Sequence, residues 1–588
     1  MLQSLLKKTS GAALLMLVSA SGMNSRAATF TAVASGNFNA ASTWGGVAPA
    51  SSLTSDVIII PAGLTVTLTD MVTFSGSSSL TVLGSLSSVS GGDLIMTSGD
   101  LSGAGSINVD SLSLGLSSGM YFAGNIMARN LTSTGVNISS AANVYVRNTL
   151  RLTAGSLSVA SGKLSMAEKS TIEVSGGMLT YSSPGMLNLD STYNVVYLSG
   201  ASSTGLELYG DGLDSVTVKV SGTLNLSDDV ELNSVLSLQS GMLSLNNKSL
   251  TLGADADIAT GGSGTISGSA FSNLTVKTMV TPSGSLRFTS GSNVLNNLTI
   301  NTGSGTAGIM LGSNLNVNGT LSLLSGKIML GSNDLYLNAG SGITGGSANS
   351  YVQADGSGRL MANLAAGSNA TFMVGTATDY TPIMVAANTA SVTSDVGVSV
   401  KGSVMAKGTS GTVLSTTQPM VKNTWYITSS ATSGINFDLT AMWNSTLEVN
   451  AFNRTQAYIA HYTGGMWDVA SPAAATSVSG GMYAMTRTGI TSLSPFMVTD
   501  KDAITTSVKE MAQSVADITI FPAPANDAIN IRSSKPINEV AIFNMEGKLV
   551  KTAAYTGKSI SVSELPTGLY MVQLTGDEVR EVRRIEKQ

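Results

Sequence analysis

The chain has 588 residues, of which 43% are hydrophobic and only 11% are charged, which excludes a disordered protein and predicts several domains. The net charge of -5, without a basic cluster interleaved with aromatic side chains, argues against nucleic acid as a partner. The chain has no cysteine and a single histidine, which excludes disulfides and thiolate metal sites and removes most catalytic schemes, so we expect no catalytic site, metal or cofactor.

Residues 1–28 have the features of an export signal peptide. Lys7 and Lys8 precede an apolar run at 11–20, and small residues follow it. A run of this length is too short to span a bilayer, and no second long apolar run appears later in the chain. We therefore expect no transmembrane span in the mature chain, with an uncleaved anchor as the alternative. The candidate cleavage positions are Ala20, Ala27 and Ala28.

Residues 29–56 precede a repetitive region and are predicted to cap it. A stack of strands exposes an edge at each end, and a bare edge recruits other chains. The segment contains a Gly-Asn pair followed by Trp44 and leads into the strand DVIIIPAG. It resembles the opening cap of β-helical surface proteins of Bacteroidetes-type bacteria. The residues that carry this resemblance are Asp56, Val57, Ile58, Pro61 and Gly63.

Residues 57–350 are predicted to form a right-handed parallel β-helix. The stretch LSLQSGMLSLNNKSLTL places Leu236, Leu243 and Leu250 seven residues apart, each at the start of a Leu-x-Leu triplet. In a helix the two leucines of a triplet point to opposite faces, whereas in a strand they share one face. Serine, glycine and asparagine fill the gaps, and they suit tight corners better than helix interiors. The spacing therefore predicts short strands joined by corners.

The same pattern recurs around Leu150 and around Leu321. Three strands of this pitch make a coil of roughly 21 residues with three faces, and residues 57–350 hold roughly thirteen such coils. Each inward aliphatic side chain then stacks on its equivalent one coil along, about 4.8 Å away. A fully buried one contributes roughly 1.5 to 3 kcal/mol before the entropy cost. The remaining repeated positions are Leu157, Leu164, Ile328 and Leu335.

Residues 351–500 lose the seven-residue spacing and are richer in aromatic residues. Alternating patterns such as NTWYITSS and INFDLTAMW predict an antiparallel β-sandwich that closes the end of the β-helix. Exposed aromatic rings stack on sugars, so Trp443 and Trp467 are candidate carbohydrate contacts. Because the aromatic positions alternate along the strands as an inward face does, we favour a packing role.

Residues 501–588 form a separate region, because they are far richer in charged residues than the rest of the chain. We expect a linker at 501–515. Residues 516–588 contain alternating Ile, Val and Phe, with prolines at the expected strand entries and glycines at the expected turns. This pattern predicts a small Ig-like β-sandwich.

Four segments of this region, ITIFPAPANDAINI, VAIFNMEGKLV, SISVSELPTGLYMVQL and RRIEKQ, occur in an order that resembles the type A sorting domain of the Bacteroidetes type IX secretion system. The resemblance implies that the secretion machinery recognises residues 516–588, moves the chain across the outer membrane and removes the tail. The protein is then released or attached to the cell surface. Ala523 departs from the family, which commonly has Asn there, and an ordinary stabilising domain is the alternative. The matching residues are Phe521, Pro522, Pro524, Asp527, Gly547, Lys548, Leu565, Gly568, Tyr570, Val572 and Lys587.

Carboxylates on the β-helix are the remaining candidates for chemistry. Parallel β-helices host polysaccharide lyases and glycosidases, which need clustered carboxylates. No basic partner is evident for the candidates here, so we favour solvated side chains or loose cation ligands. His461 has no evident triad partners and is interpreted as structural. The candidate carboxylates are Asp255 with Asp257, and Asp228, Asp229 and Glu231.

The expected function is that of a non-enzymatic structural or adhesive protein that is secreted or held at the outer cell surface. An exterior of uncharged Ser, Thr and Asn suits contact with glycans or with host or bacterial surfaces. The alternative is a secreted β-helix enzyme that degrades polysaccharides, as a lyase or a glycosidase. A groove that holds three carboxylates, or two with an arginine, favours the enzyme.

Overall fold

The computed structural model describes residues 27–115, 120–138, 142–159, 162–181, 187–189, 191–502, 518–576 and 579–588. The chain divides into two compact units, unit 1 (residues 1–499) and unit 2 (residues 500–588). Almost all of the predicted signal peptide and most of the predicted linker lie outside the described residues. The fold is all-β, with 54% strand and 4% helix, as predicted.

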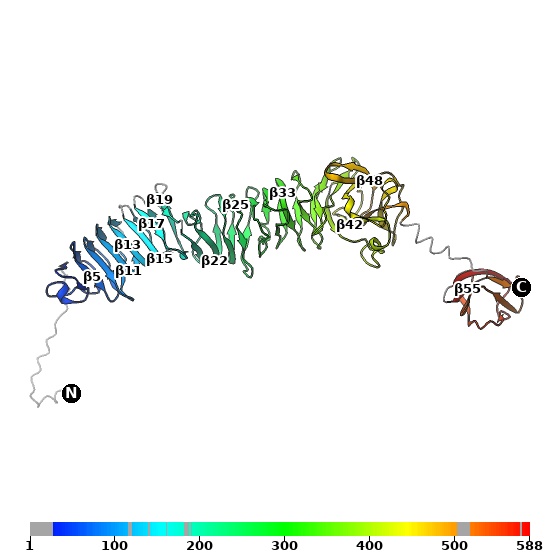
Figure 1. Ribbon diagram of the computed structural model, residues 1–588, viewed down its shortest axis with the longest axis horizontal. Coiled ribbons are helices and arrows are strands. Elements are labelled where there is room, and N and C mark those ends of the chain that lie inside the picture. The colour runs from blue at the N-terminus through cyan, green and yellow to red at the C-terminus, as the bar shows by residue number, and fades with distance from the viewer. Residues whose placement is uncertain are drawn as a thin grey trace, which may run out of the picture. The chain divides into compact units, whose positions relative to one another are not determined.

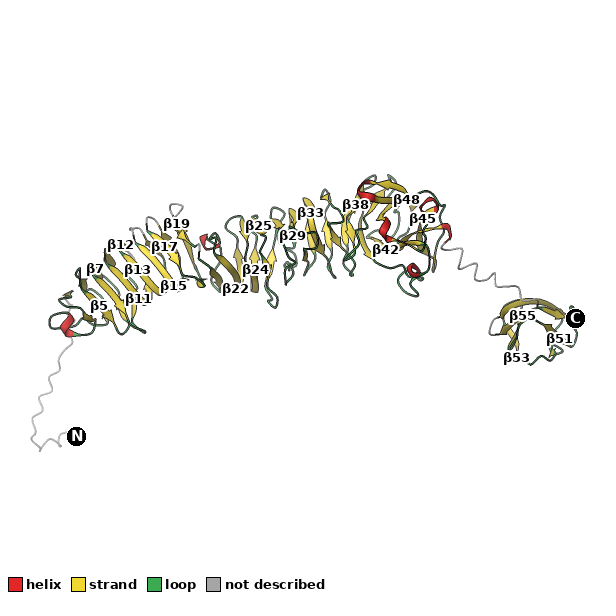
Figure 2. Cartoon of the chain, in the orientation of Figure 1, coloured by secondary structure: helices red, strands yellow, loops and turns green. Residues whose placement is uncertain are grey.

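Unit 1 begins with a parallel β-solenoid of about 15 turns (Figures 1 and 2). Strands of successive turns stack in register: β4 (Val57–Ile60) pairs with β7 (Ser79–Val82), and β7 pairs with β10 (Asp100–Gly103). The hydroxyl groups of Thr67 and Ser87 lie 3.1 Å apart and are 20 residues apart in the chain. The predicted coil of roughly 21 residues is therefore confirmed.

The seven-residue leucine spacing follows the corners of one coil. Strand β24 (Val235–Ser244) carries Leu236 and Leu243, β25 (Ser249–Leu252) carries Leu250, and all three side chains are buried. Gly241, with φ of 74°, provides the left-handed backbone between the first two leucines. Each leucine belongs to a different column, so the three predicted faces are confirmed. The stacked partners are Val216 and Ile258 for Leu236, Leu224 and Ile266 for Leu243, and Val230 and Leu274 for Leu250.

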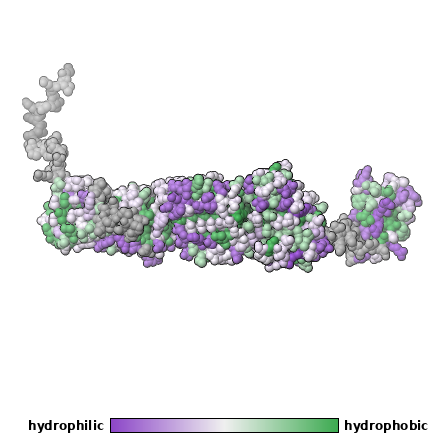
Figure 3. Space-filling view, turned by 90° about the horizontal axis from the view of Figure 1, so that it is seen from above, coloured by the Kyte–Doolittle hydropathy of each residue, from purple (hydrophilic) through white to green (hydrophobic). Residues whose placement is uncertain are grey.

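The outer surface of the solenoid carries ladders of uncharged polar side chains. The amide of Asn143 donates to Asn125 over 3.2 Å, and the amide of Asn148 donates to Asn130 over 3.1 Å, each across one coil. Pale and purple residues occupy much of this surface, with smaller apolar areas between them (Figure 3). Stacking therefore buries aliphatic columns and leaves a weakly charged exterior.

The segment at 29–56 closes the first end of the solenoid and also forms part of its first turn. Strand β1 (Thr29–Thr31) pairs in parallel with β4. The Trp44 indole is buried, donates from Nε1 to the Phe38 carbonyl oxygen over 2.7 Å, and packs edge-on against the Phe38 ring at 5.4 Å. Asp56 Oδ1 accepts a 2.9 Å hydrogen bond from the backbone N–H of Ala28. These contacts cover the open end of the core.

The other end of the solenoid continues directly into antiparallel sheets. Parallel pairing runs past residue 350, since β36 (Ser350–Gln353) pairs with β39 (Val374–Gly375). Strand β37 (Leu360–Leu364) belongs to both parts, because it pairs in parallel with β34 (Leu335–Leu337) and antiparallel with β41 (Ser394–Lys401). A strand that would be an exposed edge is thereby covered.

Unit 2 contains two small antiparallel sheets around one core. One sheet has the order β50-β51-β54 and the other the order β53-β52-β55-β56. Ile529, Val540 and Leu574 are buried in the core between them. The predicted small sandwich is confirmed in the described residues. The strands are β50 (Thr519–Phe521), β51 (Ala528–Arg532), β52 (Glu539–Asn544), β53 (Leu549–Ala554), β54 (Ile560–Ser561), β55 (Gly568–Gly576) and β56 (Val579–Lys587).

Candidate functional site

One coil of the solenoid lacks regular strands on two of its three faces. The ladder through β16 (Gly155–Val159) ends at β19 (Gly177–Tyr181), and the ladder through β17 (Lys163–Met166) ends at β20 (Leu187–Asn188). The next coil, residues 199–212, carries the short 3-10 helix η2 (Leu206–Leu208), which lies between β19 and β24 (Figure 2). Residues 199–212 therefore interrupt the regular stack, and we call them the irregular coil.

A cavity of about 600 Å³ lies beside the irregular coil. This volume is within the range of small-ligand sites, which combine an apolar wall with a few polar groups. Residues of the neighbouring coils complete the cavity, so it exists only when the coils are stacked. Its apolar lining includes Met178, Leu187, Leu189 and Leu206, and its polar lining includes Thr204, Tyr209, Asp211, Ser227 and Asp228.

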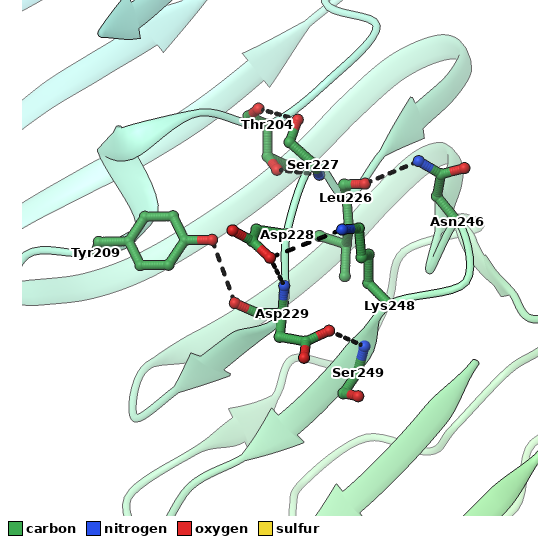
Figure 4. Close-up of polar contacts among 9 residues, drawn as sticks. All are labelled: Thr204, Tyr209, Leu226, Ser227, Asp228, Asp229, Asn246, Lys248 and Ser249. Atoms are coloured by element: carbon green, nitrogen blue, oxygen red, sulfur yellow. Dashed lines mark hydrogen bonds and ion pairs between the residues drawn. The ribbon is translucent and has the colours of Figure 1, made fainter. Parts of the chain in front are cut away.

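Tyr209 and Asp228 line the cavity, and Lys248 lies on the next coil (Figure 4). The Tyr209 hydroxyl donates to the Asp229 carbonyl oxygen over 3.2 Å, and the residue is 49% exposed. The Asp228 side chain is 75% exposed, and its Oδ1 lies 3.7 Å from Lys248 Nζ. By contrast, Asp229 Oδ1 accepts the backbone N–H of Ser249 over 2.7 Å. Asp229 therefore ties two coils together, while Asp228 remains open to solvent.

Glu207 is fully buried in η2 and was not predicted as a site residue. Its Oε1 accepts hydrogen bonds from the Tyr197 hydroxyl at 2.6 Å and from the Gly205 backbone N–H at 2.7 Å. The Tyr193 hydroxyl donates to the Glu207 carbonyl oxygen over 2.8 Å. Burial raises the pKa of the Glu207 carboxyl, because the charged form loses its hydration. Glu207 does not line the cavity, so it positions the irregular coil and cannot contact a ligand there.

Replacing Glu207 by glutamine is expected to remove a pH-dependent part of the stability of unit 1. Because the pKa of Glu207 is raised on folding, the folded chain binds this proton more tightly than the unfolded chain. The stability that protonated Glu207 contributes to unit 1 is complete below the unfolded pKa of about 4.5, and it is lost as the pH rises through the folded pKa. Glu207→Gln should therefore gain stability relative to the parent as pH rises from 5 to 8, measured by thermal unfolding. Equal slopes of stability against pH for Glu207→Gln and the parent would contradict the assignment.

The other predicted carboxylates do not assemble into one site. Glu231 Oε2 lies 3.1 Å from Lys277 Nζ, and Asp257 Oδ1 accepts the backbone N–H of Ser283 over 2.6 Å. Asp255 is exposed. The lysine partner of Asp228 lies one coil further along and that of Glu231 two coils further along, which is why the sequence did not reveal them. Across the described ranges, no three His, Cys, Asp or Glu side chains are grouped to hold a metal ion.

The aromatic candidates in the sandwich are buried. Trp443 donates from Nε1 to Glu448 Oε1 over 2.8 Å, and Trp467 donates from Nε1 to the Met405 carbonyl oxygen over 2.9 Å. Neither ring is available to stack on a sugar, because protein atoms already cover it. The carbohydrate contact considered for these two residues therefore does not fit the structure, whereas packing does.

His461 is also buried, as expected for a structural histidine. Its ring stacks on Phe496 with centroids 4.5 Å apart, and its backbone N–H donates to Asp468 Oδ1 over 2.7 Å. Arg487 pairs with the same carboxylate at 2.6 Å. Burial lowers the pKa of His461, since the protonated ring would lose hydration beside the arginine. The histidine therefore packs within the sandwich core.

The sorting motif expected in unit 2 consists largely of residues that build its fold. Leu565, Tyr570 and Val572 are buried, and the Tyr570 hydroxyl donates to the Pro566 carbonyl oxygen over 2.8 Å. Gly547, with φ of 79°, lies in the turn between β52 and β53. The remaining motif residues lie at strand ends or turns: Phe521, Pro522, Pro524, Asp527, Lys548 and Gly568 are at least partly exposed, and Lys587 is nearly buried.

Comparison with known proteins assigns unit 2 alone. Residues 519–588 match the family described as secretion system C-terminal sorting domain. This region is therefore a type IX secretion sorting domain, which indicates export and a cell-surface or secreted location. No curated protein and no solved structure matches the chain. In the part of the chain that the structure describes, no helix combines the length and apolar character needed to cross a bilayer.

Proposed function

We propose that the protein is a non-enzymatic structural or adhesive protein, exported through unit 2, and that unit 1 binds a ligand outside the cell. The observation that carries the proposal is the cavity beside the irregular coil. Continuing the strands through residues 199–212 would extend two ladders and their buried columns. The irregular coil therefore gives up strand pairing that the neighbouring coils have. Local departures of this kind from a regular pattern are expected at functional positions.

The ligand class that best fits this cavity is a neutral glycan. The Tyr209 ring supplies a partly exposed apolar surface, and Asp211 and Asp228 supply acceptors for sugar hydroxyl groups. Lys248 pairs with Asp228 and offsets its charge. Asp211 also lines the cavity, so these three side chains together carry a net negative charge. Anionic sugars such as uronates are therefore disfavoured by like-charge repulsion.

The same geometry supports binding rather than hydrolysis. A glycosidase uses two carboxyl groups that flank the scissile bond, and its acid catalyst lies in a desolvated environment. Asp228 is largely exposed and pairs with Lys248, while the buried carboxyl of Glu207 faces Tyr197 in the core. The polysaccharide-degrading enzyme remains the alternative that the experiment must address.

A glycan array probed with residues 28–499, a compact unit by itself, tests the proposal. We expect binding of neutral glycans without product release. Tyr209→Ala should weaken that binding about tenfold, because an aromatic contact contributes roughly 0.5 to 1.5 kcal/mol beyond its buried area. Tyr121→Ala, at an exposed tyrosine on the remote strand β12 (Met120–Phe122), is the matched control and should bind as the parent does.

Three results would contradict the proposal. Shortened oligosaccharides in the supernatant support the enzyme instead. Unchanged binding by Tyr209→Ala places the ligand elsewhere on unit 1. Tighter binding of uronates than of neutral glycans contradicts the charge argument made for Asp211 and Asp228.

A further inference from the structure

The outer face of the four-stranded sheet in unit 2 carries a row of large apolar side chains. Leu549 of β53 lies opposite Phe543 of β52, where the register shifts by one residue after Ile542, and Phe543 lies opposite Met571 of β55. Residues directly opposite in antiparallel strands point to the same face. Ile542 and Val572, the chain neighbours of Phe543 and Met571, are buried in the core. The row therefore points away from the core, because successive side chains in a strand alternate.

Two further exposed apolar residues lie on the same face in the rows on either side: Val582 lies opposite Gln573, and Leu569 lies opposite Glu586. Leu549 is 49%, Val582 46% and Leu569 40% exposed. The solvated face of an antiparallel sheet normally carries polar side chains. In one adjacent row Thr552 and Gln573 are polar and Val582 is apolar, and in the other Leu569 lies beside the charged Glu586. The apolar character is thus local, and we call Leu549, Phe543, Met571, Leu569 and Val582 the outer apolar patch.

We propose that the outer apolar patch is the surface by which unit 2 docks on the type IX export machinery. An exposed apolar cluster on a small domain marks an interaction site. The match to sorting domains gives unit 2 a role that requires recognition by that machinery. The buried motif residues Leu565, Tyr570 and Val572 maintain the fold and cannot form the contact themselves.

The row also indicates the chemistry of its partner. Met571 lies opposite Arg584 and Leu569 lies opposite Glu586, both exposed on β56, so one cationic and one anionic group border the apolar side chains. The complementary surface is therefore an apolar patch with an acidic group next to Arg584 and a basic group next to Glu586. This inference depends on the export role of unit 2 and not on the ligand of unit 1.

Export of the full chain from a bacterium with an active type IX system tests the proposal. We expect Leu549→Ser/Leu569→Ser to lower the amount at the cell surface and in the medium at least tenfold, with accumulation inside the outer membrane. Both side chains are substantially exposed, so unit 2 should remain folded, which protease resistance of the retained chain verifies. Arg532→Ser, at an exposed residue of β51 in the other sheet, is the control and should be exported normally.

A conservative variant separates apolar contact from side-chain identity. Leu549→Met/Leu569→Met keeps the apolar surface and should be exported like the parent. Parental export of the folded serine variant overturns the proposal, as does failure of the folded methionine variant. If the serine variant loses protease resistance, Val582→Lys on the edge strand β56 provides the same test. Normal export of folded Val582→Lys then overturns the proposal.

Discussion

Replacing Ile328 by alanine is expected to destabilise the adjoining coils by about 2 to 5 kcal/mol, which is the usual cost of removing a large aliphatic side chain from a packed core. Ile328 is fully buried in β33 (Thr320–Met329), between Ile309 of the preceding coil and Val352 of the following coil. The deletion opens a void in the column that neighbouring coils cannot close without shifting their register.

The measurement must report local as well as global unfolding. Solenoid stability is approximately a sum of terms from each coil and its neighbours, so the damage should be greatest near the substitution. Urea unfolding gives the free energy, and hydrogen exchange should show the largest loss of protection in β31 (Gly308–Met310), β33 and β36. Leu324→Ala is the matched control, because Leu324 lies in the same strand and is 57% exposed. It should cost less than about 0.5 kcal/mol, and an equal cost at both positions would contradict the aliphatic column.

Truncating unit 1 after Leu364 is expected to make it associate at micromolar concentration more strongly than residues 28–499 do. The cut removes β41, the antiparallel partner of β37, and β39, the parallel partner of β36. Two strands of the last coil then present unpaired backbone groups, which recruit other chains. Light scattering and sedimentation of residues 28–364 and 28–499 compare the open and covered ends.

An edge-charged variant provides the control for this truncation. Met361 and Asn363 alternate with the buried residues of β37 and are half-buried in unit 1. Met361→Lys/Asn363→Lys in the truncated chain should return its association to the level of residues 28–499, because charged side chains on an edge strand oppose pairing. A truncated chain without the lysines that associates no more than residues 28–499 do would show that the antiparallel sheets are not needed as a cover.

The interior columns were predictable because the information lies within short stretches of chain. A Leu-x-Leu triplet puts two apolar side chains on one face of a strand, and a corner residue such as Gly241 ends that strand. The sorting domain was predicted from the resemblance of four ordered segments in residues 516–588 to a known family, and three of its motif residues, Leu565, Tyr570 and Val572, are buried. The sequence also favoured packing for Trp443, although it left the sugar contact open.

The irregular coil was not predicted, although the stretch TGLELYG contains a usable signal. Glu207 stands between two leucines and near Tyr209, and an isolated carboxylate in an apolar setting is unusual for a buried strand. The sequence did not show that Tyr197 covers this carboxylate, nor that Lys248 reaches Asp228. Tyr197 lies 10 residues before Glu207, about half a turn away, and Lys248 lies one coil after Asp228.

The sequence by itself determined that the chain is all-β, that a three-faced solenoid forms its body, and that a sorting domain follows. Only the tertiary structure decided which coil loses its strands, which carboxylates gain lysine partners, and how β37 joins the solenoid to the antiparallel sheets. The physical reason is the range of the interactions. Strand faces and corners depend on neighbours a few residues away, whereas contacts across coils depend on the length of every intervening turn.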